Sequence, residues 1–288
     1  MSELDDYTFN GKKNFVIADA CTHSGGREKE KDAIVKKTSA NLERLALFQA
    51  KLYADARESL LIVLQALDAA GKDSTIKHVM STINPQGVDV FGFRTPNLEE
   101  ASHDFLWRYH SKLPARGKIS IFNRSYYEEV LVVNVHEYFK EYRVPARMLR
   151  GGYINQKYKD IRNWEKYLYG NGIKVVKIFL NLSKNEQQKR FLERIDKPEK
   201  NWKFSSNDIK ERAYFERYQK AYEDAINNTA TRNCPWFVLP ADQKWYTRYL
   251  VSEILLQALT DIDPQFPELD EEEAQHLQDC RTQLADER

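Results

Sequence analysis

The 288-residue chain has few cysteines, no long apolar run and almost no net charge. Its three cysteines, Cys21, Cys234 and Cys280, are far apart and odd in number, which excludes a disulfide framework and a Cys-x-x-Cys metal site and favours a reducing compartment. No apolar stretch approaches the roughly 18 to 20 residues that a membrane helix needs. The N-terminus is acidic and polar, without the apolar core of a signal peptide. We therefore expect a cytoplasmic protein that is neither secreted nor inserted in a membrane.

The charge balance limits the partners of the chain. Lysine and arginine number 44 and aspartate and glutamate 43, which leaves a formal charge of +1. A dedicated nucleic-acid coat protein would carry a large positive excess, so we expect no nucleic-acid partner, and any polyanion must be held by a local basic patch. Hydrophobic residues at 42% and charged residues at 30% are ordinary globular values. The length is enough for one substantial core and a small insertion.

Apolar runs and helical periodicities alternate along the chain. The run Leu60–Leu64 is continuously apolar, as in a central parallel strand that is covered on both faces. Four more strands are expected at residues 88–93, 118–122, 173–180 and 236–239. Helices are expected at residues 31–56, 74–83, 98–109, 145–169 and 245–259. This alternation predicts an α/β fold with a doubly wound parallel sheet and right-handed crossovers.

Composition divides the chain into three parts. We interpret residues 1–30 as an N-terminal arm without clear periodicity, residues 31–262 as the α/β domain, and residues 263–288 as an acidic C-terminal tail or short helix. Between about residues 183 and 227 the helices become dense in charge. This insertion has two interpretations, a solvated helical hairpin or a mobile lid.

A small-residue loop directly follows the first strand. Gly71-Lys72 stands between that strand and the start of a helix, which is the context of a Walker A phosphate-binding motif. Such a loop directs backbone N–H groups and a helix N-terminus toward phosphate, and its lysine supplies a mobile cation. The phosphate-binding residues predicted here are Ala69, Ala70, Gly71, Lys72, Asp73 and Ser74. A chance strand–turn–helix with a surface lysine is the alternative.

The loop departs from the usual Walker pattern. Ala66 occupies the place of the first glycine, and Asp73 replaces the Ser or Thr that follows the lysine. Asp68 puts a carboxylate inside an anion-binding loop, where it would repel phosphate unless a divalent cation lay between them. We therefore interpret Asp68 as a ligand of Mg²⁺ that takes over from the missing hydroxyl.

A second strand end carries polar groups of a similar kind. Residues 118–122 lead into Asn123, Arg124 and Glu128 at a helix start, and ligands of open α/β sheets bind at such carboxyl ends. Arg124 has the planar fork that suits phosphate, Asn123 can orient a water or the substrate, and Glu128 can bind a metal or a nucleotide hydroxyl. An Arg–Glu ion pair at the helix start, with no ligand, is the alternative.

Both segments are part of a longer series of motifs. From about residue 30 to residue 260 the chain resembles the polyphosphate kinase 2 family. The resemblance rests on five motifs in order, Asp68–Asp73, Thr75–Met80, Asn84–Gly87, Ser102–Arg108 and Phe122–Glu128. It implies a P-loop kinase core like that of thymidylate kinase, with a helical lid. It also implies reversible phosphoryl transfer between inorganic polyphosphate and a nucleotide.

The resemblance further implies roles for single residues. Asp68 is similar to a metal ligand of the family, and Lys72 and Arg124 are similar to its phosphate-binding residues, so these three are the predicted catalytic residues. Members restricted to nucleoside diphosphates typically have Asp where this chain has Asn123. Asn123 together with Glu128 resembles the class III branch, which is associated with both AMP and ADP as acceptors. Mg²⁺ is the implied cofactor, with Mn²⁺ as a substitute, and Glu128 is a second predicted metal ligand.

A chain of phosphates needs several cations along its path. The predicted polyphosphate contacts beyond the loop are Lys77, Arg190, Arg194, Lys200 and Lys203. Arg94 and Thr95, after the second strand, are predicted to border the nucleotide, with adenine as the expected base and guanine as an alternative. We assign no general base, because a terminal phosphate oxygen of AMP or ADP is already anionic. A homo-oligomer, either a dimer or a tetramer, is also expected.

Two other functions stay open on the sequence. An ATP-dependent nucleoside monophosphate kinase would use the same fold, loop lysine and lid, and differs in its phosphate donor. A non-catalytic P-loop module would bind nucleotide or polyanion without turnover. Asp68, Lys72 and Arg124 speak against the second of these.

Overall fold

The computed structural model describes residues 3–142, 144–149 and 152–287. In this part of the chain a six-stranded sheet has the order β1-β6-β5-β2-β4-β3. The strands are β1 (Thr8–Phe9), β2 (Ser59–Ala66), β3 (Val88–Gly92), β4 (Ile119–Asn123), β5 (Ile173–Asn181) and β6 (Trp236–Pro240). β2 to β6 pair in parallel with one another, and β1 pairs antiparallel with β6. The predicted α/β sheet is confirmed, and the five predicted strands lie where they were expected.

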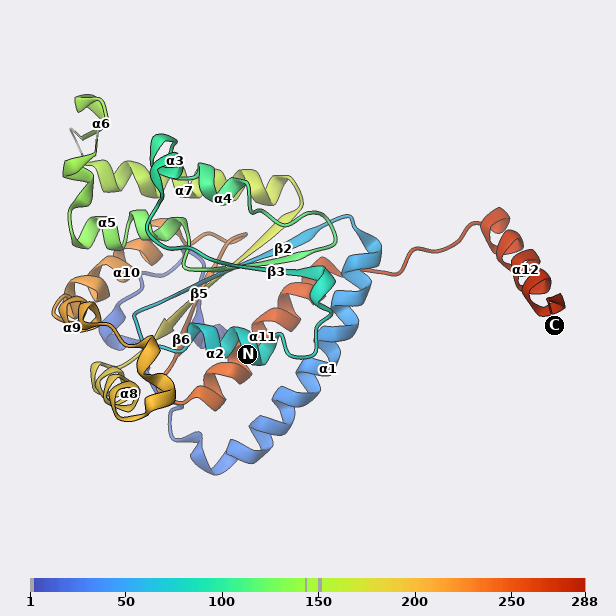
Figure 1. Ribbon diagram of the computed structural model, residues 1–288, viewed down its shortest axis with the longest axis horizontal. Coiled ribbons are helices and arrows are strands. Elements are labelled where there is room, and N and C mark those ends of the chain that lie inside the picture. The colour runs from blue at the N-terminus through green and yellow to red at the C-terminus, as the bar shows by residue number, and fades with distance from the viewer. Residues whose placement is uncertain (1–2, 143, 150–151, 288) are drawn as a thin grey trace.

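Helices cover both faces of the sheet (Figure 1). One layer contains α1 (Lys31–Asp55), α2 (Lys72–Val79) and α11 (Lys244–Ile262). The other layer contains α3 (Leu98–Ser102), α4 (Trp107–His110), α5 (Val132–Val135), α6 (Ala146–Leu149), α7 (Tyr153–Gly170) and α10 (Phe215–Thr229). After β5 come α8 (Lys184–Asp196) and α9 (Ser206–Arg212), within the segment predicted as a lid. Short 3₁₀ segments occupy Asp5–Tyr7, Ile17–Asp19, Arg27–Glu30, Pro85–Gly87, Tyr126–Glu129, Tyr138–Glu141 and Pro198–Lys203.

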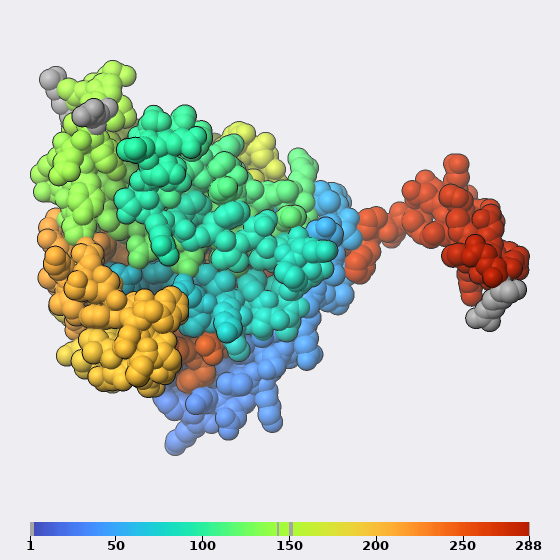
Figure 2. Space-filling model, in the orientation of Figure 1, coloured from blue at the N-terminus to red at the C-terminus, as the bar shows by residue number. Residues whose placement is uncertain are grey.

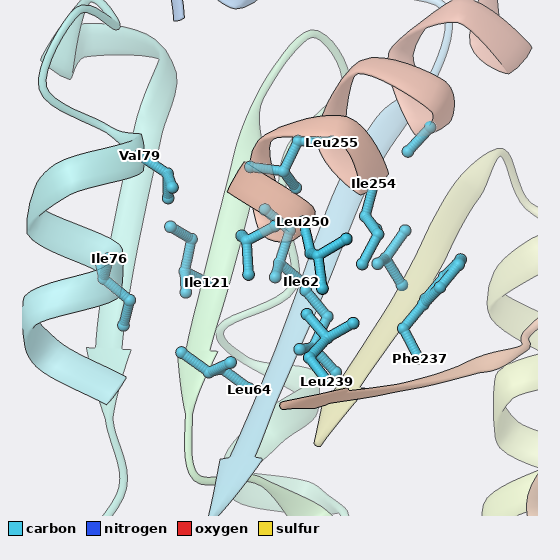
Figure 3. Packing of buried hydrophobic residues seen from close by; sticks show 14 of the residues in the cluster. Ile62, Leu64, Ile76, Val79, Ile121, Phe237, Leu239, Leu250, Ile254 and Leu255 are labelled. Carbon is cyan, nitrogen blue, oxygen red and sulfur yellow. The ribbon is translucent and has the colours of Figure 1, made fainter. Parts of the chain in front are cut away.

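The packing of β2 explains its unbroken apolar sequence. All eight of its residues are buried. Ile62 and Leu64 point into a cluster with Leu250 of α11 (Figure 3), whereas Leu61 and Val63 belong to the cluster on the opposite face. Successive side chains of a strand point to opposite faces, so a strand between two helical layers must be apolar at every position. β2 therefore places the loop that follows it at the centre of the sheet's carboxyl edge.

Two of the predicted helices are divided. Residues 98–109 form α3 and α4, because Asp104 Oδ1 accepts a hydrogen bond from Leu106 N at 2.9 Å and closes a local turn between them. Residues 145–169 divide into α6 and α7, and Gly152, with a φ of +100°, precedes α7. Residues 150 and 151 lie outside the described part. The prediction of one continuous helix in each region was wrong.

The two ends of the chain behave differently. N-terminal residues add β1 to the sheet, and Phe15 is buried, with its backbone N–H and C=O both hydrogen-bonded to the Asn227 side chain of α10. The C-terminal helix α12 (Glu271–Asp286) stands away from the body at the end of an extended segment (Figure 1). Among the described residues, no helix is both long enough and apolar enough to cross a membrane.

Candidate active site

The loop between β2 and α2 is held from one side by α8. Gln187 Nε2 donates to the carbonyl of Asp68 at 3.0 Å, and Arg190 Nη1 donates to the carbonyls of Ala69 at 3.0 Å and Ala70 at 2.9 Å. In a trans peptide the C=O and N–H groups point in opposite directions. The amide N–H groups that share these peptide units therefore point away from α8. The Ala70 N–H donates within the loop to the Leu67 carbonyl at 3.3 Å, which leaves the Ala69 and Gly71 N–H groups as the donors that an anion could meet.

Both strand-end turns contain residues in the left-handed backbone region. In the first loop Ala69 has a φ of +65° and Gly71 a φ of +101°, and after β4 Arg124 has a φ of +64°. At Gly71 a Cβ would also lie 3.3 Å from Ser74 Oγ, so glycine suits both the conformation and the close approach. A left-handed alanine or arginine costs roughly 1–2 kcal/mol, and such residues cluster at ligand-binding sites.

Lys72 is the first residue of α2 and folds back over the loop. Its Nζ donates to the carbonyl of Ala66 at 2.8 Å and lies 3.5 Å from that of Leu67. Burial is the main cause that lowers the pKa of Lys72 to about 8, and the neighbouring Arg124 guanidinium is the second. An ammonium that is poorly solvated and faces another cation has much to gain from a bound anion.

Arg124 joins the two strand ends. Its Nη2 donates to Asp68 Oδ1 at 2.8 Å, and its Nη1 lies 3.6 Å from Glu128 Oε2. Beside it, Asn123 Nδ2 donates to Asp73 Oδ1 at 2.8 Å. β2 and β4 are adjacent parallel strands, so their carboxyl ends bring together side chains that are 50 residues or more apart in sequence. The ion pair with Asp68 is shorter than the local pair with Glu128, so Arg124 is more than a helix-start salt bridge.

Asp68 and Glu128 are the two carboxylates that flank this arginine. Burial raises the pKa of Glu128, although Arg124 and Lys72 act in the opposite direction. In the described part of the chain, no group of three or more His, Cys, Asp or Glu side chains forms a self-sufficient metal site. Mg²⁺ is usually held by one or two carboxylates together with substrate phosphates. Two carboxylates beside a loop that is predicted to bind phosphate fit that kind of site.

A pocket opens from these residues toward α9 and α10. Its lining consists of Ala66, Leu67, Asp68, Arg124, Glu128, Leu131, Val132, Gln187, Asp208, Glu211, Arg212, Phe215, Tyr218 and Tyr222. Charged groups come from the strand ends and from α9, and aromatic rings come from α10. The lining has four carboxylates, those of Asp68, Glu128, Asp208 and Glu211, and two arginines, so a phosphate group would enter it together with a cation.

The family assignment comes from comparison with known proteins. The sequence profile described as polyphosphate kinase 2 matches residues 28–267. The chain belongs to the polyphosphate kinase 2 family. The resemblance drawn from the five sequence motifs is thereby confirmed.

Several relatives of this polyphosphate kinase 2 chain span nearly its whole length. It is 46% identical over 245 residues to an ADP-polyphosphate phosphotransferase of Rhodopseudomonas palustris, covering 84% of this chain and 85% of that protein. It is 41% identical over 256 residues to an AMP/ADP-polyphosphate phosphotransferase of Meiothermus ruber, covering 89% and 91%. A crystal structure of polyphosphate kinase 2 from Arthrobacter aurescens matches with a TM-score of 0.82 and 37% identity, covering 91% of both chains. This structural match agrees with the P-loop kinase fold that we inferred from the sequence.

The basic residues predicted in the lid of this family member have different surroundings. Arg190 is only 6% exposed, and its Nη2 donates to two carbonyls of the segment after β6, at 2.7 and 3.0 Å. Arg194 pairs with Asp208 at 3.5 Å, and Lys203 lies over the ring of Trp202, 4.9 Å from its centroid. Polyphosphate contacts by Arg190, Arg194 and Lys203 stay predictions. The Arg190 guanidinium is already fully engaged in holding loops in place.

The remaining predicted site residues lie outside the central cluster. Lys77 is exposed on α2, and Arg94 and Thr95 are exposed after β3. The Arg94 carbonyl accepts a hydrogen bond from Arg108 Nη1 at 2.9 Å. Roles of Lys77 in phosphate binding and of Arg94 and Thr95 in nucleotide binding stay predictions.

Three residues at this site escaped the sequence reasoning. Gln187 holds the loop, and Tyr218 and Tyr222 line the pocket from α10. The four-residue spacing of the two tyrosines indicates one shared helix face. That spacing does not say toward which strand end the face is directed, because the direction depends on how α10 packs on the sheet.

Proposed function

We propose that the chain transfers phosphoryl groups reversibly between inorganic polyphosphate and adenine nucleotides, with AMP and ADP as acceptors and ADP and ATP as products. The observation that carries this proposal is the convergence of Asp68, Lys72 and Arg124 at the carboxyl ends of β2 and β4. The names of the Rhodopseudomonas and Meiothermus relatives support polyphosphate as one substrate and AMP or ADP as the other. Guanine nucleotides stay an alternative acceptor.

Charge neutralisation and alignment account for the chemistry. Phosphoryl transfer passes through a loose transition state in which charge is spread over the equatorial oxygens. Lys72, Arg124 and the loop N–H groups supply positive charge to those oxygens. The acceptor is a phosphate oxygen that is already anionic, so no side chain has to remove a proton. Arg124 keeps its orientation through Asp68 until phosphate takes over one side of its planar fork.

Asp68 and Glu128 are the residues that would hold Mg²⁺, with Mn²⁺ as a substitute. Their carboxylates lie on either side of Arg124. Among the described residues, Arg124 is the one side chain that donates a hydrogen bond to Asp68 Oδ1. A divalent cation held by Asp68 and Glu128 would neutralise part of the phosphate charge. The two carboxylates alone are an incomplete ligand set, so we expect metal and phosphate to bind together.

The nucleotide acceptor is proposed to lie in the pocket beside α10. Tyr218 and Tyr222 provide an aromatic wall, and Arg124 and Glu128 provide charged groups for the phosphate and its cation. In this proposal the acceptor phosphate lies beside Lys72, at the start of α2. A homo-oligomeric state stays a prediction.

A donor assay tests the proposed function. Purified protein is incubated with AMP or ADP, polyphosphate and Mg²⁺ without ATP, and the nucleotides are separated by chromatography. We expect ADP and then ATP to form from AMP. Formation of ADP only when ATP is supplied would instead identify an ATP-dependent nucleoside monophosphate kinase. Binding without turnover of any donor would identify a non-catalytic module.

Asn123 is predicted to help admit AMP. In an Asn123→Asp variant a new carboxylate would face Asp73, whose oxygen now accepts a bond from Asn123 at 2.8 Å. Repulsion between two carboxylates is relieved by an additional cation. Such a cation suits a diphosphate acceptor better than a monophosphate. The loss in kcat/KM should therefore be roughly tenfold larger for AMP than for ADP.

The control for this comparison is Asn163→Asp, an exposed position on α7. It adds the same charge away from the site and should leave kcat/KM unchanged for both AMP and ADP. Equal losses with AMP and ADP in Asn123→Asp would remove Asn123 from acceptor selection.

Lys72 predicts an alkaline limit to polyphosphate use. Its pKa is lowered to about 8, so the free protein carries the ammonium below that pH and loses it as the pH rises through about 8. A neutral amine attracts phosphate less strongly, and kcat/KM reports ionisations of the free enzyme. We expect kcat/KM for polyphosphate to fall above about pH 8. The arginine of a Lys72→Arg variant keeps its charge to above pH ~12, so the residual kcat/KM of this variant should not fall above about pH 8. If the fall is unchanged in Lys72→Arg, another group causes it.

A further inference from the structure

A buried cluster of polar side chains lies on the core side of the turn that follows β4. Its members come from that turn, α7, β5 and α10, and each is at most 1% exposed. We call it the Glu165 cluster, and it consists of Tyr126, Tyr127, Glu165, Lys177 and Thr229. α5, which follows the turn, meets α10 at the surface, where the green and orange segments touch (Figure 2). The cluster joins the same turn to α10 inside the core, because Tyr127 Oη and Thr229 Oγ1 are 2.9 Å apart.

The bonds of this cluster converge on the carboxylate of Glu165. Its Oε1 accepts hydrogen bonds from the hydroxyls of Tyr126 at 2.8 Å and Tyr127 at 2.9 Å. Its Oε2 accepts one from Lys177 Nζ at 2.7 Å. The same ammonium donates to the Thr229 carbonyl at 2.9 Å and to the Tyr127 hydroxyl oxygen at 3.1 Å. All three donors of the ammonium therefore have an acceptor, and the carboxylate is held at both of its oxygens.

Stability alone does not explain this cluster. Its surroundings on this face of the sheet are apolar, with Ile161 and Leu168 of α7 and Ala225 and Ile226 of α10. Replacement of a buried ion pair by apolar residues of similar volume is often neutral or stabilising. Apolar contacts are non-directional, whereas hydrogen bonds fix the direction and distance of the groups that they join. The cluster therefore gives the turn a defined position that apolar packing would not give it.

The two tyrosines belong to the turn that carries Arg124. They begin the 3₁₀ segment Tyr126–Glu129, which starts two residues after Arg124. Arg124 has a φ of +64°, and a residue other than glycine keeps such a conformation only where its surroundings over-determine it. The hydroxyls of two adjacent residues are bound to one oxygen of Glu165, which restricts rotation of the turn about its own axis. One anchor alone would leave that rotation open.

The orientation of Arg124 depends on anchors on both sides of it. On the strand side, its backbone N–H donates to the Leu64 carbonyl at 3.1 Å. On the other side, after Ser125, the Glu165 cluster holds the turn. Between these anchors the guanidinium reaches Asp68 at 2.8 Å. A misplacement of about 1 Å can cost roughly 10²-fold in rate, so a small shift of the turn would be felt at the planar fork.

We propose that Glu165 is a positioning residue for Arg124 and acts through the two tyrosine hydroxyls of the turn. Lys177 keeps the Glu165 carboxylate in place from β5. Among the described residues that line the pocket, none belongs to the Glu165 cluster, so the cluster does not touch a substrate there. This inference rests on the proposed function, because it takes Arg124 to act on the transferring phosphate.

Removal of the two hydroxyls tests the positioning role. The double variant Tyr126→Phe/Tyr127→Phe breaks both bonds to Glu165 and keeps both rings. With ADP as acceptor and polyphosphate as donor, we expect kcat to fall about tenfold, less than the roughly 10²-fold that a displacement of 1 Å costs. KM for both substrates should stay within about twofold of the parent, because the loop and the pocket wall are untouched and alignment counts in the transition state. A parental kcat in the folded double variant would overturn the inference.

A second background shows whether the loss passes through Arg124. In an Arg124→Gln variant the group to be positioned is gone, so the two Phe substitutions should lower kcat by no more than about a further twofold. A cluster that only supports the fold would lower kcat by the same factor in both backgrounds. Equal factors would therefore overturn the positioning role.

Two controls match the double variant. Tyr158→Phe removes a buried hydroxyl of α7 that has no hydrogen-bond partner among the described residues, and it should keep the parental kcat. Ile226→Val, at a wholly buried position of α10, should lower the melting temperature through the loss of one methyl group without lowering kcat. A tenfold fall of kcat in Ile226→Val would show that lost stability alone explains the effect, and would overturn the inference.

The single variant Tyr126→Phe carries the test if the double variant does not fold, because Tyr127 and Lys177 still bind Glu165. It should lower kcat about threefold, which is half of the free-energy effect of the double variant, and should leave kcat of Arg124→Gln unchanged. Any other pattern would overturn the inference. A parent protein that does not turn over polyphosphate would overturn the proposed function instead.

Discussion

A Lys72→Met variant is expected to lose about 10²–10³ in kcat while it keeps its fold, as for the loss of one preorganised charge-stabilising donor. The ammonium is buried against two carbonyls and the Arg124 guanidinium, and its lowered pKa shows that the folded state holds this charge at a cost. Methionine has a similar length without the charge. Measurement of kcat with polyphosphate and of the melting temperature separates lost chemistry from lost stability.

The control for this variant is Lys166→Met, which removes an exposed lysine from α7. It should keep both kcat and the melting temperature. A folded Lys72→Met enzyme with nearly parental kcat would refute the role of the loop lysine. Unfolding of Lys72→Met alone would show that the carbonyl contacts of Lys72 are structural, and Lys72→Arg would then test its charge.

An Asp68→Asn variant is expected to lose a similar factor, about 10²–10³ in kcat, and to need more Mg²⁺ for half-maximal rate. The amide oxygen can still accept the bond that Arg124 now donates at 2.8 Å, so the arginine should stay oriented. What is lost is the charge that attracts the cation. A titration of rate against Mg²⁺ concentration measures this effect, and an unchanged Mg²⁺ requirement would remove Asp68 from the metal site.

The double variant Asp68→Asn/Lys72→Met tests whether the two residues act as a unit. If both act on one transferring phosphate, the loss in kcat should exceed that of the worse single variant by only a few-fold, because such effects are strongly non-additive. Losses that multiply would instead indicate independent roles.

Much of the fold could be predicted because its signals are local. β2 is a strand between two helical layers, and that situation requires an apolar residue at each position, which the run Leu60–Leu64 displays. The helix breaks near Asp104 and at Gly152 were missed. A short polar side chain that closes its own turn, or one glycine, interrupts a periodicity that otherwise looks continuous.

The strand β5 shows a different limit. Lys177 stands inside an otherwise apolar strand and is wholly buried, with its Nζ 2.7 Å from Glu165 Oε2 of α7. Glu165 also accepts hydrogen bonds from Tyr126 and Tyr127, the residues just after Ser125 in the second strand-end turn. A buried lysine is tolerable only with such partners. From the sequence, Lys177 can be placed in a buried strand. Its partners cannot be identified in that way, because they come from two other elements.

The sequence by itself determined the parallel sheet and the family and predicted a phosphate-binding loop, because an apolar run, ordered motifs and a Gly-Lys at a helix start are properties of adjacent residues. Only the tertiary structure decided which charges serve that loop. Arg190 looked like one more lid cation, yet it is tied to carbonyls 120 and 121 residues away. The physical reason is that the worth of a charge depends on its burial and its neighbours, and chain packing sets both.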